Sequence, residues 1–213
     1  LFLSLPNGEA QKIIKKNFHY KHLKFIDLSA DFRIRDFNKY KNWYSINHKA
    51  KNLIDKSIYS IPEFTKDVIK KFRIIANPGC YPTSIQLPLI PLFKESLLST
   101  NNITIDSKSG YSGAGKNYKL KFSHKNFYTS IFSYGIEKHR HMSELDQEFK
   151  KYSKTSVHYT FNPHLLPTFR GILSSIYLET KKNIKIQEIY SCLKKFHSKN
   201  TFVKLHKINT PMG

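Results

Sequence analysis

The residue with the clearest chemical potential in this sequence is Cys80, within the run Asn77-Pro78-Gly79-Cys80-Tyr81-Pro82-Thr83. An apolar strand-like segment precedes it, and an apolar helix-like segment follows it. The thiol is therefore predicted to lie where a helix begins, and unpaired N–H groups and the helix dipole there lower a thiol pKa and favour the thiolate. Gly79 allows a turn that a β-carbon would forbid, and Pro82 suits a first helical turn. Cys80 is thus either a nucleophile or a buried structural cysteine.

A glycine-rich segment, residues 108–116, follows a predicted strand. It places Gly110, Gly113 and Gly115 close to Ser112 and a second serine. Such small residues let backbone N–H groups approach a ligand closely. The spacing differs from G-x-G-x-x-G, so the segment is either a ligand-binding loop or a flexible surface loop.

Two histidines, His139 and His141, stand where a predicted helix begins. Residues two apart on a helix point in different directions, so the pair does not suit a metal ion, and we expect no metal site. His141 and Glu144 are three residues apart and share a face. A histidine oriented by a carboxylate is typical of a general acid or base. The alternative is a solvated first turn, in which Glu144 only complements the helix dipole.

Two further groups of polar residues follow predicted strands. Arg170 lies among apolar residues and either pairs with a structural carboxylate or holds an anionic substrate through two parallel hydrogen bonds. Ser29 and Arg33 follow an earlier strand and either hold a phosphate or cap the next turn.

The elements that must position these side chains differ between the two halves of the chain. Short apolar runs at residues 1–5, 24–29 and 72–77, with a helical pattern at 8–16, predict a doubly wound parallel sheet. Ligands bind such sheets beyond the carboxyl ends of the strands. That edge is expected to carry Asp27, Ser29, Asn77 and Cys80.

The second half predicts an α+β arrangement. Alternating apolar residues at 102–107, 157–161 and 172–178 indicate strands with one buried face, which we expect to form a mixed or antiparallel sheet. Helical spacing at 142–152 and 189–196 predicts the helices that cover them.

Composition excludes some classes of function. The net charge of +21 favours a nucleic-acid partner, but only five of the 36 basic residues are arginine, the usual reader of bases and phosphates. A solvated lysine surface is therefore the preferred interpretation. The sequence contains no run of 18 apolar residues, so it predicts no membrane-spanning helix. Two distant cysteines indicate neither a disulfide framework nor a zinc site, as expected for a cytoplasmic protein.

Taken in order, several segments resemble the N-acetyl-gamma-glutamyl-phosphate reductase family, which acts in arginine biosynthesis. The resemblance covers most of the chain, with residues 77–83 and 139–141 as its most specific parts. The matching segments are residues 3–8, 27–33, 59–64, 77–83, 108–116, 137–144 and 163–171.

The resemblance implies that Cys80 attacks an acyl phosphate to form a thioester, which NADPH then reduces. It assigns acid–base work to His141 and places Ser112, Gly113 and Gly115 at the cofactor. Residues expected to bind substrate are Ser29, Arg33, Asn77, Glu144 and Arg170.

The resemblance also implies a domain organisation. Residues 1–79 are expected to form part of an NADP-binding Rossmann-like domain, and residues 80–213 a catalytic and dimerisation domain of a homodimer or homotetramer. The family's G-x-x-G-x-x-G turn is expected before Leu1 and a further segment after Gly213, so we interpret the chain as a piece of a longer protein. A related acyl phosphate, such as aspartyl or aminoadipyl phosphate, is the alternative substrate, and a basic nucleic-acid-binding domain is a third hypothesis.

Overall fold

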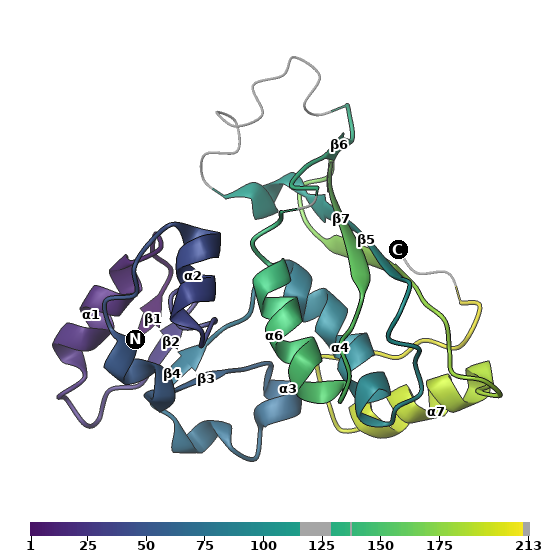
Figure 1. Cartoon of the computed structure of the whole chain (residues 1–213), viewed down its shortest axis with the longest axis horizontal. Coiled ribbons are helices and arrows are strands. Elements are labelled where there is room, and N and C mark those ends of the chain that lie inside the picture. The colour runs from purple at the N-terminus through teal and green to yellow at the C-terminus, as the bar shows by residue number, and fades with distance from the viewer. Residues whose placement is uncertain (116–128, 137, 211–213) are drawn as a thin grey trace. The chain divides into compact units, whose positions relative to one another are not determined.

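A computed structural model describes residues 1–115, 129–136 and 138–210 (Figure 1). The chain divides into two compact units. The first comprises Leu1–Thr83 with Arg140–Gln147, and the second comprises Ser84–His139 with Glu148–Gly213. The division at Thr83 lies near the expected boundary at residue 79. The segment Arg140–Gln147, which we placed in the second domain, instead packs with the first unit.

The first unit is built on a four-stranded parallel sheet with the order β1-β2-β4-β3. The central strands are β2 (Phe25–Asp27) and β4 (Ile74–Ala76), and the edges are β1 (Phe2–Leu3) and β3 (Ser57–Tyr59). The parallel sheet confirms the predicted class for this half. Strand β3 was not predicted, because it opens on the polar Ser57, where β2 and β4 open on Phe25 and Ile74.

Helices pack apolar side chains onto this sheet. In α1 (Glu9–Asn17), Ala10 and Ile14 join Phe25 and Ile74 in one buried cluster. The remaining helical segments of the unit are α2 (Phe37–Tyr44), α3 (Pro62–Thr65) and the 3₁₀ turns η1 (Lys51–Lys56) and η2 (Ile69–Lys71).

The carboxylate of Asp31 fixes the turn between β1 and α1. The N–H of Gly8 donates to both carboxylate oxygens, at 2.7 and 2.9 Å, and the Tyr40 hydroxyl donates to Oδ1 at 2.7 Å. These bonds supply partners for donors at the helix start, and they hold the carboxyl edge of the sheet in place.

Helix α4 (Cys80–Lys94) follows β4 and begins with Cys80. Pro82 lies in its first turn, as predicted, but Pro88 and Pro91 lie inside it. Pro91 has no N–H for the carbonyl of Leu87, and Nε2 of His197 donates to that oxygen at 3.0 Å. His197 closes α7 (Ile186–His197), so α7 restores a hydrogen bond that the proline removes from α4.

The sheet of the second unit has the order β6-β7-β5-β8. Its strands are β5 (Ile103–Gly110), β6 (Phe132–Ser133), β7 (Tyr159–Leu166) and β8 (Ile172–Tyr177). The expected mixed or antiparallel sheet is confirmed as mixed: β8 and β6 pair antiparallel with β5 and β7, whereas β5 and β7 are parallel over eight residues. A long connection containing α6 (Met142–Tyr152) separates these two strands in sequence, which is what a parallel pair requires.

Serine hydroxyls join α4 to this sheet. Ser174 on β8 lies 2.8 Å from the hydroxyl of Ser84 on α4 and 2.7 Å from that of Ser107 on β5. Within the described residues, no helix combines the length and apolar character needed to cross a membrane.

Asp27 makes the first unit sensitive to pH. It lies at the carboxyl end of β2, it is fully buried, and its Oδ1 accepts from the N–H of Ser29 at 2.9 Å. Burial raises the pKa of this carboxyl from 3.8 to about 6. The folded protein therefore holds the proton more tightly than the unfolded chain. The resulting stabilisation is complete below pH 3.8 and is lost as the pH rises through about 6.

We expect Asp27→Asn to stabilise the protein more at pH 7.5 than at pH 5.0, by about 1.4 kcal/mol, the equivalent of one pKa unit. Urea unfolding of wild type and variant at both pH values measures this difference. Asp67→Asn, at an exposed position, is the matched control for removing a carboxylate. A stability gain that is the same at both pH values would contradict the prediction.

Candidate active site

Cys80 is exposed at the first position of α4, and this position excludes a buried structural cysteine. The N–H groups of Tyr81 and Cys80 lower the pKa of the thiol, as expected at a helix start. These two N–H groups do not lower the pKa of the thiol overall. The protein atoms packed around the sulfur withdraw water from it and, together with the charge of Glu144, raise the thiol pKa overall. The expectation of a lowered pKa is therefore wrong for the protein without substrate.

His141 immediately precedes α6, and its ring lies against the residue before the cysteine. A β-carbon placed on Gly79 would lie only 2.5 Å from Nε2 of His141. The ring also meets Tyr81 edge-on, with 6.0 Å between centroids. Gly79 is thus required for this close approach of the imidazole, and not for the unusual backbone turn that we expected, because its φ lies outside the left-handed region.

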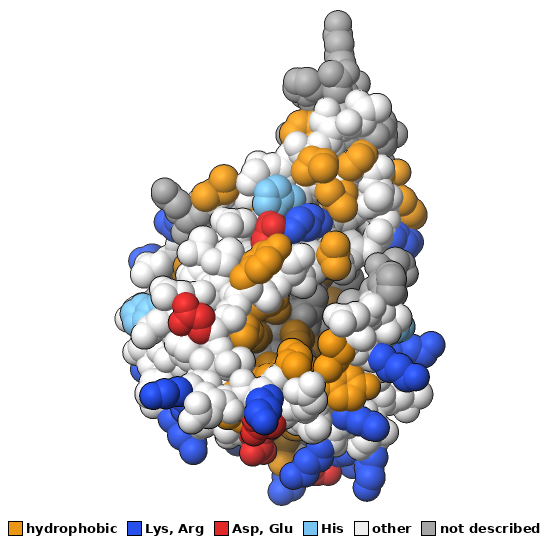
Figure 2. Space-filling view, turned by 90° about the vertical axis from the view of Figure 1, so that its right-hand side faces the viewer, with side chains coloured by type: hydrophobic (Ala, Val, Ile, Leu, Met, Phe, Trp, Pro, Cys, Tyr) orange, Lys and Arg blue, Asp and Glu red, His pale blue; other side chains and the backbone are white. Residues whose placement is uncertain are grey.

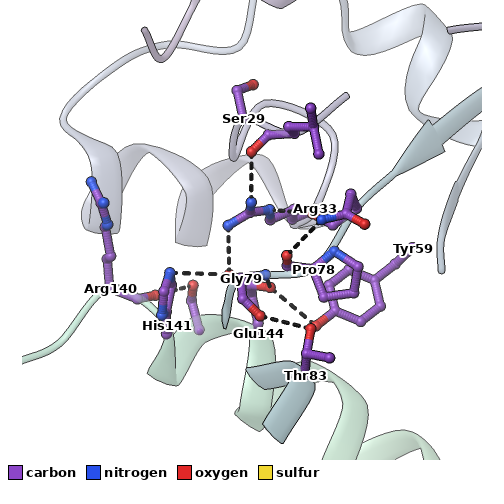
Figure 3. A network of polar contacts seen from close by, with 12 residues as sticks. Ser29, Arg33, Tyr59, Pro78, Gly79, Thr83, Arg140, His141 and Glu144 are labelled. Carbon is purple, nitrogen blue, oxygen red and sulfur yellow. Dashed lines mark hydrogen bonds and ion pairs between the residues drawn. The ribbon is translucent and has the colours of Figure 1, made fainter. Parts of the chain in front are cut away.

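The carboxylate of Glu144 is fully buried and accepts three hydrogen bonds, shown in Figure 3. Nη1 of Arg33 donates to Oε1 at 3.1 Å, and the Tyr59 hydroxyl and the Gly79 N–H donate to Oε2 at 3.0 and 2.8 Å. Nε2 of His141 lies 4.0 Å from Oε1. The shared face of His141 and Glu144 is therefore confirmed, and the alternative of a solvated first turn is wrong.

Arg33 is buried, and each of its nitrogens has a partner in the protein. Besides Glu144, it donates to the backbone oxygens of Asn77 at 2.7 Å and Leu28 at 2.8 Å. Burial alone would lower the pKa of Arg33, but the neighbouring Glu144 reverses the direction and raises it. These contacts occupy the side chain that the sequence assigned to a phosphate.

Ser29 also turns toward the protein. Its side chain is buried, and its hydroxyl accepts from the N–H of Asp31 at 3.2 Å, so it caps the turn that follows β2. Asn77 is half-buried, and its amide group donates to the carbonyl of Pro78 at 3.1 Å. Of the two interpretations of Ser29, the structure favours the cap.

In the second unit, the glycine-rich segment joins the loop that carries Arg170. The N–H of Gly110 donates to Gly171 O at 2.9 Å, and that of Ser112 donates to Phe169 O at 3.1 Å. A β-carbon on Gly110 would meet the backbone nitrogen of Arg170 at 2.8 Å. These backbone hydrogen bonds fix the start of the segment, so the interpretation as a flexible surface loop is not supported there. Its last residue, Lys116, lies outside the described residues.

The two other glycines of this loop differ in their surroundings. A β-carbon on Gly113 would lie 2.8 Å from Oγ of Ser109, whereas Gly115 has φ +86° and open space around it. Arg170 is exposed, with its guanidinium 5.0 Å from the centre of the Phe169 ring. The sequence therefore brings its candidate residues together in two groups, one in each unit.

Residues 80–212 match a family model described as the dimerisation domain of semialdehyde dehydrogenase. The chain belongs to the semialdehyde dehydrogenase family.

Two curated relatives match nearly all of the chain. It is 42% identical to the probable chloroplastic N-acetyl-gamma-glutamyl-phosphate reductase of Arabidopsis thaliana, over 96% of the chain and 51% of that protein. It is also 42% identical to the N-acetyl-gamma-glutamyl-phosphate reductase of Thermoanaerobacter pseudethanolicus, over 97% of the chain and 59% of that protein. The chain thus spans only about half to three fifths of the length of these relatives.

Solved structures show the same fold. Aspartate semialdehyde dehydrogenase II from Vibrio cholerae superposes with a TM-score of 0.61 at 16% identity, covering 90% of the chain and 58% of that protein. Aspartate semialdehyde dehydrogenase from Candida albicans, solved with NADP, gives a TM-score of 0.55 at 15% identity, covering 91% of the chain and 54% of that protein. At these identities the likeness establishes the fold of the chain and not its substrate.

Sequence reasoning gave no site role to Tyr59. The residue ends β3, a strand that was not predicted, and its hydroxyl reaches a carboxylate 85 positions away in the chain. The segment at 59–64 is one of those that resemble the family, and this resemblance was the only feature of the sequence that pointed to Tyr59. Among the described residues, no group of three potential metal ligands is present.

Proposed function

We propose that the polypeptide containing this chain reduces N-acetyl-L-glutamyl 5-phosphate to N-acetyl-L-glutamate 5-semialdehyde and phosphate, a step of arginine biosynthesis. The observation that carries the proposal is the His141 ring packed on Gly79, directly before an exposed Cys80. The 42% identity to reductases of that name supports this substrate over aspartyl phosphate.

In this mechanism the Cys80 sulfur attacks the acyl carbon, the carbon–oxygen bond to phosphate breaks, and phosphate leaves with the electron pair. A thioester remains on Cys80. The raised thiol pKa means that the thiolate must form as the reaction begins. We assign to His141, whose ring packs on Gly79, the uptake of the thiol proton and, later, the handling of the proton at the substrate oxygen when the thiohemiacetal collapses.

NADPH fits the glycine-rich loop of the second unit. Gly115, at positive φ with open space around it, allows a planar group to approach the backbone, and we propose that Ser112, Gly113 and Gly115 hold the nicotinamide end. When bound, NADPH supplies a hydride to the thioester carbonyl.

The remaining site residues divide into two groups. We assign contact with the substrate to Arg170 and Asn77, because the guanidinium of Arg170 is exposed and can bind a carboxylate bidentately. Ser29, Arg33 and Glu144 shape the site from within, since all three are buried and hydrogen-bonded to the protein.

We also propose a homodimer or homotetramer assembled through the second unit. Leu173 and Tyr177 are both exposed and lie on one face of β8. Figure 2 shows hydrophobic side chains gathered among lysines and arginines. A cytoplasmic or other reducing compartment suits the chemistry, because the Cys80 thiol must stay reduced.

The test is a comparison of semialdehydes in the reverse direction with the full-length polypeptide. We expect NADP⁺ reduction that depends on phosphate to be fastest with N-acetylglutamate semialdehyde, ahead of aspartate and aminoadipate semialdehydes. NADP⁺ should be preferred to NAD⁺. Faster turnover of aspartate semialdehyde would overturn the substrate assignment and leave the thioester chemistry intact.

A further inference from the structure

Three separate segments of the first unit converge on the carboxylate of Glu144, which a fourth segment carries. Tyr59 comes from the end of β3, Arg33 from the loop after β2, Gly79 from the turn before α4, and Glu144 itself from α6. The side chain of Glu144 has no exposed surface. Both oxygens accept from the protein, so the group is poorly placed to bind a substrate.

The hydrogen bond from Gly79 links this carboxylate to the nucleophile. Because the Gly79 N–H points to Glu144, the Cys80 and Tyr81 N–H groups are the ones that act on the sulfur. The peptide before Cys80 is thereby fixed by a residue from α6 and not only by its own turn.

The same residue also lies beside the imidazole. Oε1 of Glu144 is 4.0 Å from Nε2 of His141, and the backbone N–H of Glu144 donates to the His141 carbonyl at 3.1 Å. Glu144 is therefore linked to Gly79 through its carboxylate and to His141 through its backbone.

We propose that Tyr59 and Glu144 are positioning residues that hold the Cys80 turn against the His141 imidazole through the Gly79 amide. This inference rests on the proposed function and deepens it. The phenol of Tyr59 is a neutral donor to Oε2, so it restrains the carboxylate without adding charge.

Glu144 and Tyr59 are expected to affect the pKa of the Cys80 thiol differently, because only Glu144 carries a charge. The Glu144 charge raises the pKa of the Cys80 thiol, and the Arg33 charge lowers it. Removing the carboxylate charge leaves Arg33 unopposed and favours the thiolate. The charged and titratable groups that face Glu144 are Arg33, Tyr44, Tyr59, Cys80 and His141.

The first experiment follows alkylation of Cys80 by iodoacetamide against pH in the full-length protein, with each cysteine quantified by mass spectrometry. In Glu144→Gln we expect the Cys80 profile to shift to lower pH while turnover falls. Cys192, half-buried on α7, is the internal reference and should not shift. A variant whose Cys80 reacts faster with iodoacetamide while its turnover is slower has lost the positioning of the thiol. A variant that has simply unfolded would not show this shift of Cys80 alone. An unshifted Cys80 profile with unchanged turnover would overturn the inference.

The second experiment uses Tyr59→Phe, which removes one donor and preserves charge and shape. We expect kcat to fall about 10-fold, since the lost bond is to a charged acceptor, with KM within about twofold. Tyr20→Phe, at an exposed turn, is the matched control and should leave both constants unchanged. A rise in KM with kcat unchanged would instead make Tyr59 a substrate ligand.

These readouts separate the two proposals. The alkylation profile needs no substrate, so the Glu144 effect can appear even if the acyl phosphate is another compound. If Glu144→Gln does not fold, Tyr59→Phe decides the positioning role alone. Wild-type turnover of another semialdehyde would contradict the proposed substrate and not the positioning pair.

Discussion

Replacing Cys80 with serine should abolish the phosphate-dependent reduction of NADP⁺ by N-acetylglutamate semialdehyde. We expect a loss of at least about 10³-fold in kcat, because a hydroxyl at this helix start cannot form the anion that attacks an acyl carbon near neutral pH. The substitution changes one atom in an exposed side chain, so the fold should persist. Initial rates in the full-length polypeptide, with phosphate and NADP⁺ saturating, measure the effect.

The other cysteine provides the control. Cys192 lies on α7 with its sulfur 3.8 Å from the carbonyl of Pro91, and Cys192→Ser should keep near wild-type activity. In single-turnover experiments, the acyl phosphate should also leave a covalent adduct on Cys80 when NADPH is withheld. Activity of Cys80→Ser close to wild type would exclude the thioester route.

Replacing His141 with asparagine should slow turnover by about 10²–10⁴-fold, the usual contribution of a general acid or base. Asparagine keeps a polar group near Gly79 and cannot take up the thiol proton at neutral pH. The measurement is the pH dependence of kcat, in which one limb of the wild-type profile should disappear. A loss below threefold would move the acid–base role to another group.

Gly79→Ala tests the same contact from the other side. The added methyl group would lie 2.5 Å from Nε2 of His141 and must displace the ring, and a misplacement of about 1 Å can cost about 10²-fold in rate. In the His141→Asn background the same alanine should cost little, since the ring it displaces is gone. Additive losses in the double variant would show that Gly79 acts by another route.

Much of the first unit follows from local pattern. Short apolar runs that end in polar residues predicted a parallel sheet, and the glycine, cysteine and proline of residues 79–82 predicted a helix start at the thiol. These features depend on neighbouring residues and their conformational preferences, so a single segment is enough to reveal them. Strand β3 was not predicted, because it opens on a polar residue, Ser57, and so lacks the apolar start of β2 and β4.

The second unit was predicted less completely. Strands β5, β7 and β8 and helices α6 and α7 were expected at the right places, but β6 and the parallel pairing of β5 with β7 were not. Alternation shows which face of a strand is buried and says nothing about the direction of its neighbour. Pairing is decided by the connection between the strands and by the packing of the whole sheet.

By itself, the sequence placed Cys80 at a helix start and indicated Cys80 and His141 as the residues to which we assign the chemistry. Only the tertiary structure decided what Arg33, Glu144 and Tyr59 do. Chemical type suggested substrate ligands for the first two, yet burial and hydrogen bonds direct all three side chains into the protein. The direction of the Cys80 pKa was likewise decided in three dimensions. The helix start acts through two adjacent N–H groups, whereas desolvation and the charge of Glu144 come from segments that only folding brings near.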